Sequence, residues 1–169
     1  MAKVLLVIAS KNFRDEEYAR PKEILESEGV EVKTASSRLG AIRGKLGVEA
    51  TADLLLNQVN IDDFDGIVFV GGPGAVEYFE SETALNLARQ AYAKKKIVAA
   101  ICIAPSILAN AGILKGKNAT AFPSEIDNLK NKGANYTGEP VAIDGNIITA
   151  NGPEAAEEFG KKIAEGLVV

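Results

Sequence analysis

The residue with the clearest chemical potential is Cys102, the only cysteine of a chain that contains no histidine. It ends the apolar run 96–102 and precedes the segment 104–112, which read as a buried strand followed by a short helix. Ala100 and Ala104 flank it two positions away on either side. Small residues at these positions are typical of a nucleophile elbow, where a strand turns sharply into a helix. The turn would place the sulfur at the helix N-terminus, where N–H groups and the helix dipole favour a thiolate. The competing interpretation is a small buried hydrophobic residue, because free cysteine is among the most buried residue types.

Two further groups could act together with a thiol. Gly71 and Gly72 follow an apolar run, and the N–H groups of Gly72 and Ile103 could form an oxyanion pocket. Glu17 stands in an acidic stretch near the start of an expected helix. A protonated Glu17 would donate to the sulfur, an ionised one could act as a general base, and burial would favour the protonated form. Taken singly, a Gly-Gly pair is more often a plain turn, and a first-turn carboxylate is usually solvated.

The composition excludes several kinds of site and partner. Without histidine, neither a Ser-His-Asp nor a Cys-His pair can form, and zinc sites built on imidazole are excluded. One cysteine supplies neither an internal disulfide nor a thiolate cluster, so we expect no metal and no cofactor. The net charge of −4 and the absence of a basic stripe argue against nucleic acid or a membrane surface as partner. No apolar run approaches a membrane span and no signal peptide is evident, so a reducing, cytoplasmic location is expected.

The candidate residues each follow one of the apolar runs that alternate with helical patterns along the chain. We expect strands at 3–9, 30–36, 65–70, 96–102, 117–122 and within 140–150, and helices at 15–28, 82–94, 104–112, from 124 and from 153. Gly29 should end the first helix, and Ser81 should cap the helix at 82–94. Ser124 and Asp127 fit a capping box, although Asp replaces the preferred Glu.

Four other local patterns complete the prediction. Asp144-Gly145 is a strong two-residue turn signal, so 140–150 should form a β-hairpin. The segment 38–47, rich in glycine and basic residues, should be a loop. The segment 48–59 is ambiguous, with an extended start followed by a helical turn. Pro21 should lie in or just after the first turn of its helix.

This alternation predicts an α/β fold of one domain over residues 1–169. Parallel strands joined by crossover helices form a doubly wound, mostly parallel sheet, and hence a three-layer α/β/α sandwich of flavodoxin-like type. In such folds active residues gather beyond the carboxyl ends of the strands. Glu17, Gly71-Gly72 and Cys102 all follow strand ends, so the topology can bring them together.

The same segments resemble the ThiJ/PfpI superfamily, also called the DJ-one superfamily, over nearly the whole chain. The matching segments are "NFRDEEYARP", "FDGIVFVGGPGA", "AAICIAPSILANAGILKGKNAT" and "DGNIITANGPEAAEEFGKKIAEGL". The resemblance implies a flavodoxin-like fold, Cys102 as nucleophile or oxidation site, and Glu17, counted back from Pro21, as its partner. It also implies oxyanion contacts at Gly72 and Ile103 beside Gly71, and a dimer or higher homo-oligomer.

The chain departs from its relatives at two positions where the family carries a base. One branch has histidine directly after the cysteine, where this chain has Ile103; another has histidine on the strand after the elbow helix, where it has Phe122. This chain therefore lacks the catalytic dyad of the members described as peptidases. Compared with the members described as glyoxalases, this chain lacks one proton-transfer group but keeps the cysteine and the glutamate. Tyr18 or a water molecule is a candidate substitute.

These observations leave three functions open. The leading hypothesis is that Cys102 and Glu17 act on small reactive carbonyls, as a glutathione-independent glyoxalase or protein deglycase. The second is a non-enzymatic redox sensor or stress-response chaperone, in which peroxide oxidises Cys102 to a sulfinate. The third, an intracellular cysteine peptidase, is disfavoured because the chain has no histidine.

Overall fold

A seven-stranded sheet forms the centre of the computed structural model, which describes residues 1–167. Its strand order is β10-β11-β7-β6-β1-β2-β5, and every neighbouring pair is parallel except β10 and β11. The strands of this sheet are β1 (Lys3–Val7), β2 (Glu31–Ser36), β5 (Leu54–Leu55), β6 (Gly66–Phe69), β7 (Ile97–Ile101), β10 (Val141–Asp144) and β11 (Ile147–Ala150). Two small pairs lie outside it, β3 (Gly40–Arg43) with β4 (Glu49–Ala52), and β8 (Asn118–Ala119) with β9 (Asn135–Tyr136).

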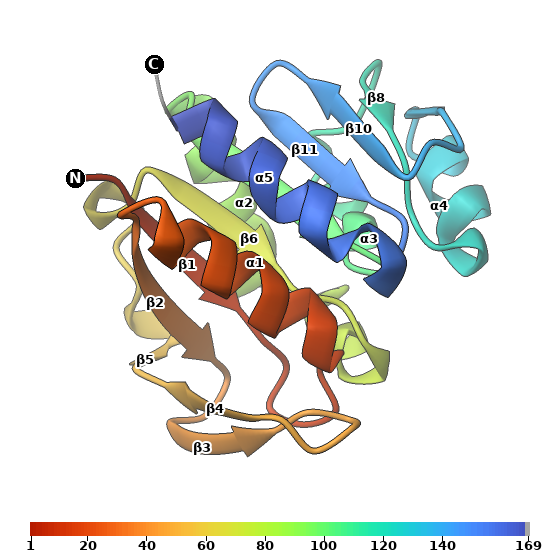
Figure 1. Cartoon of the computed structure of the whole chain (residues 1–169). Coiled ribbons are helices and arrows are strands. Elements are labelled where there is room, and N and C mark those ends of the chain that lie inside the picture. Colours follow the sequence, from red (N-terminus) through yellow and green to blue (C-terminus); the bar gives the residue numbers. More distant parts are fainter. Residues whose placement is uncertain (168–169) are drawn as a thin grey trace.

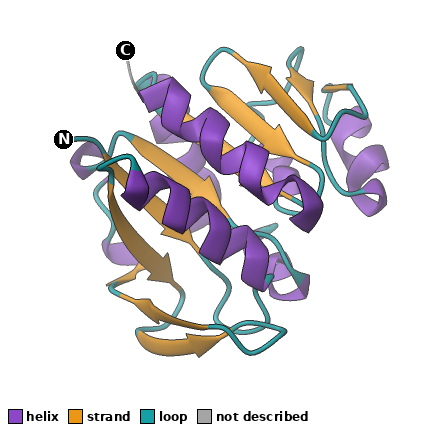
Figure 2. Cartoon of the chain, in the orientation of Figure 1, coloured by secondary structure: helices purple, strands orange, loops and turns teal. Residues whose placement is uncertain are grey.

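Helices cover both faces of the sheet, which confirms the predicted three-layer α/β/α sandwich (Figures 1 and 2). On one face α1 (Asp15–Ser27) and α5 (Ala156–Leu167) lie side by side. The other face carries α2 (Glu82–Ala93) and α3 (Pro105–Asn110), and α4 (Ile126–Asn131) packs beside α3. Two apolar clusters fill the spaces between these layers. The innermost strands are buried along their whole length, as expected for parallel strands covered on both faces.

Several local signals act as the sequence predicts. Gly29 ends α1 with φ +82°, and the Ser81 side chain accepts a hydrogen bond from the Ala84 N–H as the N-cap of α2. Strands β10 and β11 form the predicted hairpin around Gly145, which has φ +60°. Pro21 lies inside α1 just after its first turn, and it cannot donate the usual N–H to the Glu17 carbonyl.

The predicted loop at 38–47 is wrong in part, because β3 occupies Gly40–Arg43 and pairs with β4. The physical reason lies outside the hairpin. The buried Asp15 carboxylate accepts hydrogen bonds from the N–H groups of Leu46 and Val48, at 2.7 and 2.6 Å, and so fastens the turn to the start of α1. A tertiary contact of this kind outweighs the loop preference of a segment rich in glycine and charged residues.

Two further predictions need correction. The expected strand at 117–122 shrinks to β8 and joins β9 rather than the main sheet. The capping box at Ser124 and Asp127 does not form: Ser124 Oγ bonds to Glu125, and no side chain caps α4. A 3₁₀ turn at Pro123–Glu125 shifts the start of α4 to Ile126 and leaves Ser124 out of register. Among the described residues, no helix is both long enough and apolar enough to cross a membrane.

Candidate active site

Three adjacent strands carry the candidate residues to one edge of the sheet. The order β7-β6-β1 places the carboxyl ends of these strands next to one another. The chain after β1 leads into α1 and Glu17, β6 ends before Gly71 and Gly72, and β7 ends before Cys102. The topology therefore brings the predicted site residues together at the point where doubly wound folds bind ligands.

Cys102 occupies the predicted elbow. Its φ is +65°, a left-handed conformation that costs a non-glycine residue roughly 1–2 kcal/mol. Hydrogen bonds on both sides hold this conformation. The Cys102 N–H donates to the Ala150 carbonyl at 2.9 Å, and the Cys102 carbonyl accepts from the Phe122 N–H at 2.8 Å. Such strain persists where the surrounding structure imposes it, which is typical of functional positions.

Gly71 is the close-packed centre of the site. A Cβ atom at this position would lie 2.5 Å from Glu17 Oε1, 2.6 Å from the Ile101 carbonyl oxygen and 2.7 Å from Cys102 Cβ. Only a residue without a side chain leaves room for both the glutamate and the cysteine to approach this closely. This contact explains why the Gly-Gly pair is more than a plain turn.

The two predicted oxyanion donors lie beside the sulfur. The backbone N–H groups of Ile103 and Gly72 both act on the Cys102 thiol and lower its pKa. Gly72 has φ +105°, and a Cβ there would lie 2.3 Å from the Arg14 backbone nitrogen. The loop before α1 therefore fixes Gly72 in an orientation that glycine alone adopts readily.

Glu17 is a buried acid with 0% of its surface exposed. Within the described part of the chain, neither of its carboxyl oxygens has a partner at normal hydrogen-bond distance. Burial raises the pKa of Glu17 to about 8, and the neighbouring Cys102 thiol, the Arg14 charge and the Gly71 N–H lower it only in part. Glu17 is therefore mostly protonated at neutral pH, which is the first of the two roles considered from the sequence.

The state of the sulfur differs from the prediction of a thiolate. Cys102 is 9% exposed and packs in the apolar cluster beneath α1 and α5. Burial raises the pKa of Cys102 to about 12, and the charge of an ionised Glu17 adds to the rise. When Glu17 is protonated this repulsion is absent, so the pair loses its first proton more easily than its second. The short helix α3 and the two backbone amides do not outweigh the loss of solvation.

Arg14 belongs to the site although the sequence reasoning did not single it out. Its N–H donates to the Gly71 carbonyl at 2.9 Å, and its guanidinium charge interacts with both Glu17 and Cys102. The guanidinium pairs with the Glu16 carboxylate, with Nη2 to Oε2 at 2.9 Å. No sequence pattern singles out Arg14, because it is the extended N-cap residue of α1 and its link to the site is a backbone contact with Gly71.

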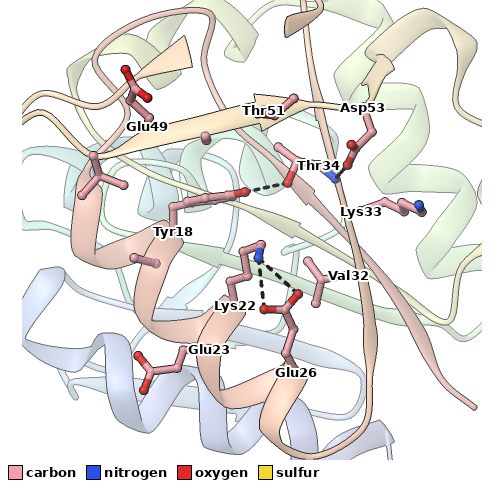
Figure 3. Close-up of a pocket in the computed structure, with 13 residues that line it drawn as sticks. Tyr18, Lys22, Glu23, Glu26, Val32, Lys33, Thr34, Glu49, Thr51 and Asp53 are labelled. Carbon is pink, nitrogen blue, oxygen red and sulfur yellow. Dashed lines mark hydrogen bonds and ion pairs between the residues drawn. The ribbon is translucent and has the colours of Figure 1, made fainter. Parts of the chain in front are cut away.

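Tyr18 does not replace the missing histidine. Its hydroxyl makes a 2.8 Å hydrogen bond with Thr34 Oγ1, and its ring packs edge-on against Phe13. Figure 3 shows that Tyr18 lines a different hollow, of about 790 Å³, between α1, β2 and β4. That hollow contains neither Cys102 nor Glu17, and its walls carry charges of both signs. The tyrosine therefore serves the packing of α1 rather than proton transfer at the sulfur.

The two positions where the family carries histidine are apolar here. Ile103 is half-buried against the same cluster as Cys102, and Phe122 is 43% exposed. Neither side chain can move a proton, so Glu17 is the titratable side chain that directly adjoins the sulfur. Among the described residues, no group of three or more acidic or cysteine side chains is placed to hold a metal ion.

The fold and this geometry define a flavodoxin-like protein with a nucleophile-elbow cysteine beside a buried glutamate. Comparison with known proteins agrees: residues 2–166 match the DJ-1/PfpI family, and the chain belongs to that family. It is 45% identical to an uncharacterized protein of Methanocaldococcus jannaschii over 98% of this chain and 82% of the relative. It is 36% identical to the deglycase PfpI of Pyrococcus furiosus, over 88% of this chain and 90% of the relative. The crystal structure of a ThiJ/PfpI domain protein from Brachyspira murdochii superposes with a TM-score of 0.96 at 37% identity, covering 98% of this chain and 95% of that one.

Proposed function

We propose that this chain is a Cys102-dependent enzyme that acts on small reactive carbonyls, of the glutathione-independent glyoxalase or protein deglycase type. The observation that carries the proposal is the strained elbow that holds Cys102 against a buried, protonated Glu17. Support also comes from archaeal relatives that are named deglycases and are about one-third identical to this chain.

The raised pKa of Glu17 gives it two successive roles with methylglyoxal. The Cys102 thiol first gives its proton to solvent; the thiolate then adds to the aldehyde carbon, and the electron pair of the carbonyl bond moves to its oxygen. The N–H groups of Ile103 and Gly72 hold this oxyanion until Glu17 gives it a proton, which completes a hemithioacetal. The resulting Glu17 carboxylate then removes the proton from the same carbon and returns it to the neighbouring carbon, while the hydroxyl proton passes through water to the oxygen of that neighbouring carbon, giving a thioester of lactate. Water hydrolyses this thioester, which releases lactate and restores the thiol.

The missing histidine sets the expected rate. General acid–base catalysis by one positioned group typically contributes roughly 10²–10⁴-fold. With Ile103 and Phe122 in place of histidine, turnover should be slow relative to an enzyme that has both groups. A slow but cysteine-dependent reaction is therefore the specific expectation.

The test is lactate formation from methylglyoxal by the purified protein without glutathione. Cys102→Ser should abolish the activity, while Glu17→Gln should keep thiol alkylation but lose most of the lactate. A parallel assay with methylglyoxal adducts of N-acetyl-lysine separates the deglycase from the glyoxalase reaction. Lactate formation that is unchanged in Cys102→Ser would contradict the proposal.

A second candidate function, a redox sensor, is favoured by the unpartnered oxygens of Glu17. A protonated Glu17 could donate to a Cys102 sulfinate, whose other oxygen would accept from the Ile103 and Gly72 amides. This role needs no histidine. Intact-mass spectrometry after mild peroxide should show two added oxygen atoms on the Cys102 peptide, and Cys102→Ser should show none. A wild-type protein that remains unmodified would exclude this role.

A peptidase remains the least favoured function. A cysteine peptidase needs a base to activate the thiol and a donor to protonate the leaving amine, usually histidine in both roles. The residue that follows Cys102 is Ile103, and the chain has no histidine to recruit.

A further inference from the structure

The backbone of Arg14 is held next to the two glycines of the site. Its N–H donates to the Gly71 carbonyl at 2.9 Å, and Gly71 in turn lies against Glu17 Oε1 and Cys102 Cβ. The Arg14 nitrogen also closes over Gly72. The Arg14 backbone is thus connected through Gly71 to both Glu17 and Cys102.

We propose that Arg14, held in place by Glu16, is the cationic positioning residue of the Cys102–Glu17 site and supplies the positive charge that a chain without histidine otherwise lacks there. The inference concerns the site of the proposed function. Its test is made on the thiol without a carbonyl substrate, so the two proposals can fail separately.

The Arg14 guanidinium is oriented by its partner. Nε lies 3.2 and 3.3 Å from the two Glu16 carboxylate oxygens, and Nη2 lies 2.9 Å from Oε2. This two-pronged contact fixes the plane of the guanidinium and leaves Nη1 free of Glu16. The Arg14 side chain is 31% exposed, so solvent screens part of its charge. Glu16 therefore both aims the cation and offsets some of its field.

The charged groups that act on the thiol and its partner all come from the start of α1. Arg14 interacts with Cys102 and Glu17, Glu16 acts on Glu17, and Glu17 acts on Cys102. The Arg14 charge lowers the pKa of Glu17, whereas Glu16 raises it. Strands β6, β7 and β11, which pack around the site, contribute apolar residues and backbone groups. The charge on the pair is therefore controlled by two neighbouring residues of opposite sign.

This arrangement makes an opposed pair of variants the sharpest test. Arg14→Gln removes the cation, and Glu16→Gln removes the anion that offsets it. We expect Arg14→Gln to slow alkylation of the native thiol by iodoacetamide at pH 7.5 by about 3- to 10-fold, since one pKa unit changes the thiolate fraction tenfold. We expect Glu16→Gln to accelerate the same reaction by about 2- to 3-fold. The pH profile should shift to higher pH in the first variant and to lower pH in the second.

Two controls separate charge from structure. Arg14→Lys keeps the charge and should react within about 2-fold of the wild type, despite losing the forked contact. Arg20→Gln removes another arginine of α1, one that pairs with Glu23 and Glu157, and should leave the rate unchanged. Thermal unfolding verifies that each variant is folded. The proposal is overturned if Arg14→Gln reacts like the wild type, or if both glutamine variants shift the profile in the same direction.

Discussion

Glu17 is an acid with no exposed surface, and its environment opposes ionisation. A folded-state pKa raised to about 8, above the ordinary value of 4.5, favours folding while the group is protonated. This contribution is fully present below about pH 4.5 and is lost as the pH rises through about 8. The buried carboxyl group of Glu17 therefore lowers the stability of the protein in neutral and alkaline solution.

The glutamine variant isolates this effect because it cannot ionise. Between pH 5 and pH 8, the free energy of unfolding of the wild type should fall relative to that of Glu17→Gln by on the order of 2–4 kcal/mol. Urea unfolding of both proteins across this pH range measures the difference. Two curves that stay parallel would mean that Glu17 titrates as an ordinary carboxylate.

At the same scale, the sequence identified most of the site. Cys102, Glu17, Gly72 and Ile103 were predictable because each type has a defined chemistry and each follows a strand whose end could be located. The state of the thiol was left open between an exposed thiolate and a buried hydrophobic residue, because its burial depends on the apolar cluster that distant segments build around Cys102. Arg14 was not, because its importance comes from a backbone contact with Gly71, far away in the sequence.

The elements of the fold test how far local signals determine structure. Ser81 and Ser124 were both expected to cap helices, and only Ser81 does so, with its oxygen accepting from the Ala84 N–H at 3.3 Å. Ser81→Ala should lower the free energy of unfolding by about 0.5–2 kcal/mol, whereas Ser124→Ala should change it by less than about 0.5 kcal/mol. Equal losses in chemical denaturation would show that the difference between the two caps is unimportant.

The strands and main helices were predictable from the apolar runs and the turn and cap residues between them. The strand β3 was not predictable, and neither were the short length of β8 and its pairing with β9. Apart from Lys3 at the start of β1, the runs in β1, β6 and β7 are apolar, as expected of strands buried on both faces. The turn of the β3–β4 hairpin depends on the Asp15 carboxylate, and the start of α4 depends on the 3₁₀ turn before it. Both features need a contact or a register that the sequence pattern does not contain.

At the scale of the whole molecule, α1 and α5 come from opposite ends of the chain and together cover one face of the sheet (Figure 1). Cys102 belongs to the apolar cluster on that face. The close approach of the two helices occurs at Gly160, where a Cβ would lie 3.0 Å from Pro21 Cα and 3.1 Å from Ile24 Cδ1. Alternation of strands and helices predicted the layers but not this pairing. The close packing of α1 against α5 thus depends on one small residue in the last helix.

A pair of glycine variants in α5 tests that dependence. Gly160→Ala should destabilise the protein by about 1–3 kcal/mol, since the Pro21 backbone cannot move aside without shifting α1. Gly166→Ala meets only the flexible end of Ile97, at 2.9 Å, and should be neutral or stabilising by up to about 1 kcal/mol. Urea denaturation compares them. A stabilised Gly160→Ala protein would show that the two helices are not tightly packed.

The most direct test of the central claim, that the elbow presents one chemically competent sulfur beside Glu17, is the rate of alkylation of the native protein between pH 6 and pH 10. The chain has a single cysteine, so every modified molecule reports on Cys102. The account predicts that the folded protein is alkylated and that the rate rises through about pH 8, as the Cys102–Glu17 pair loses its first proton. A thiol that is modified only after the protein unfolds, at every pH in this range, would contradict it.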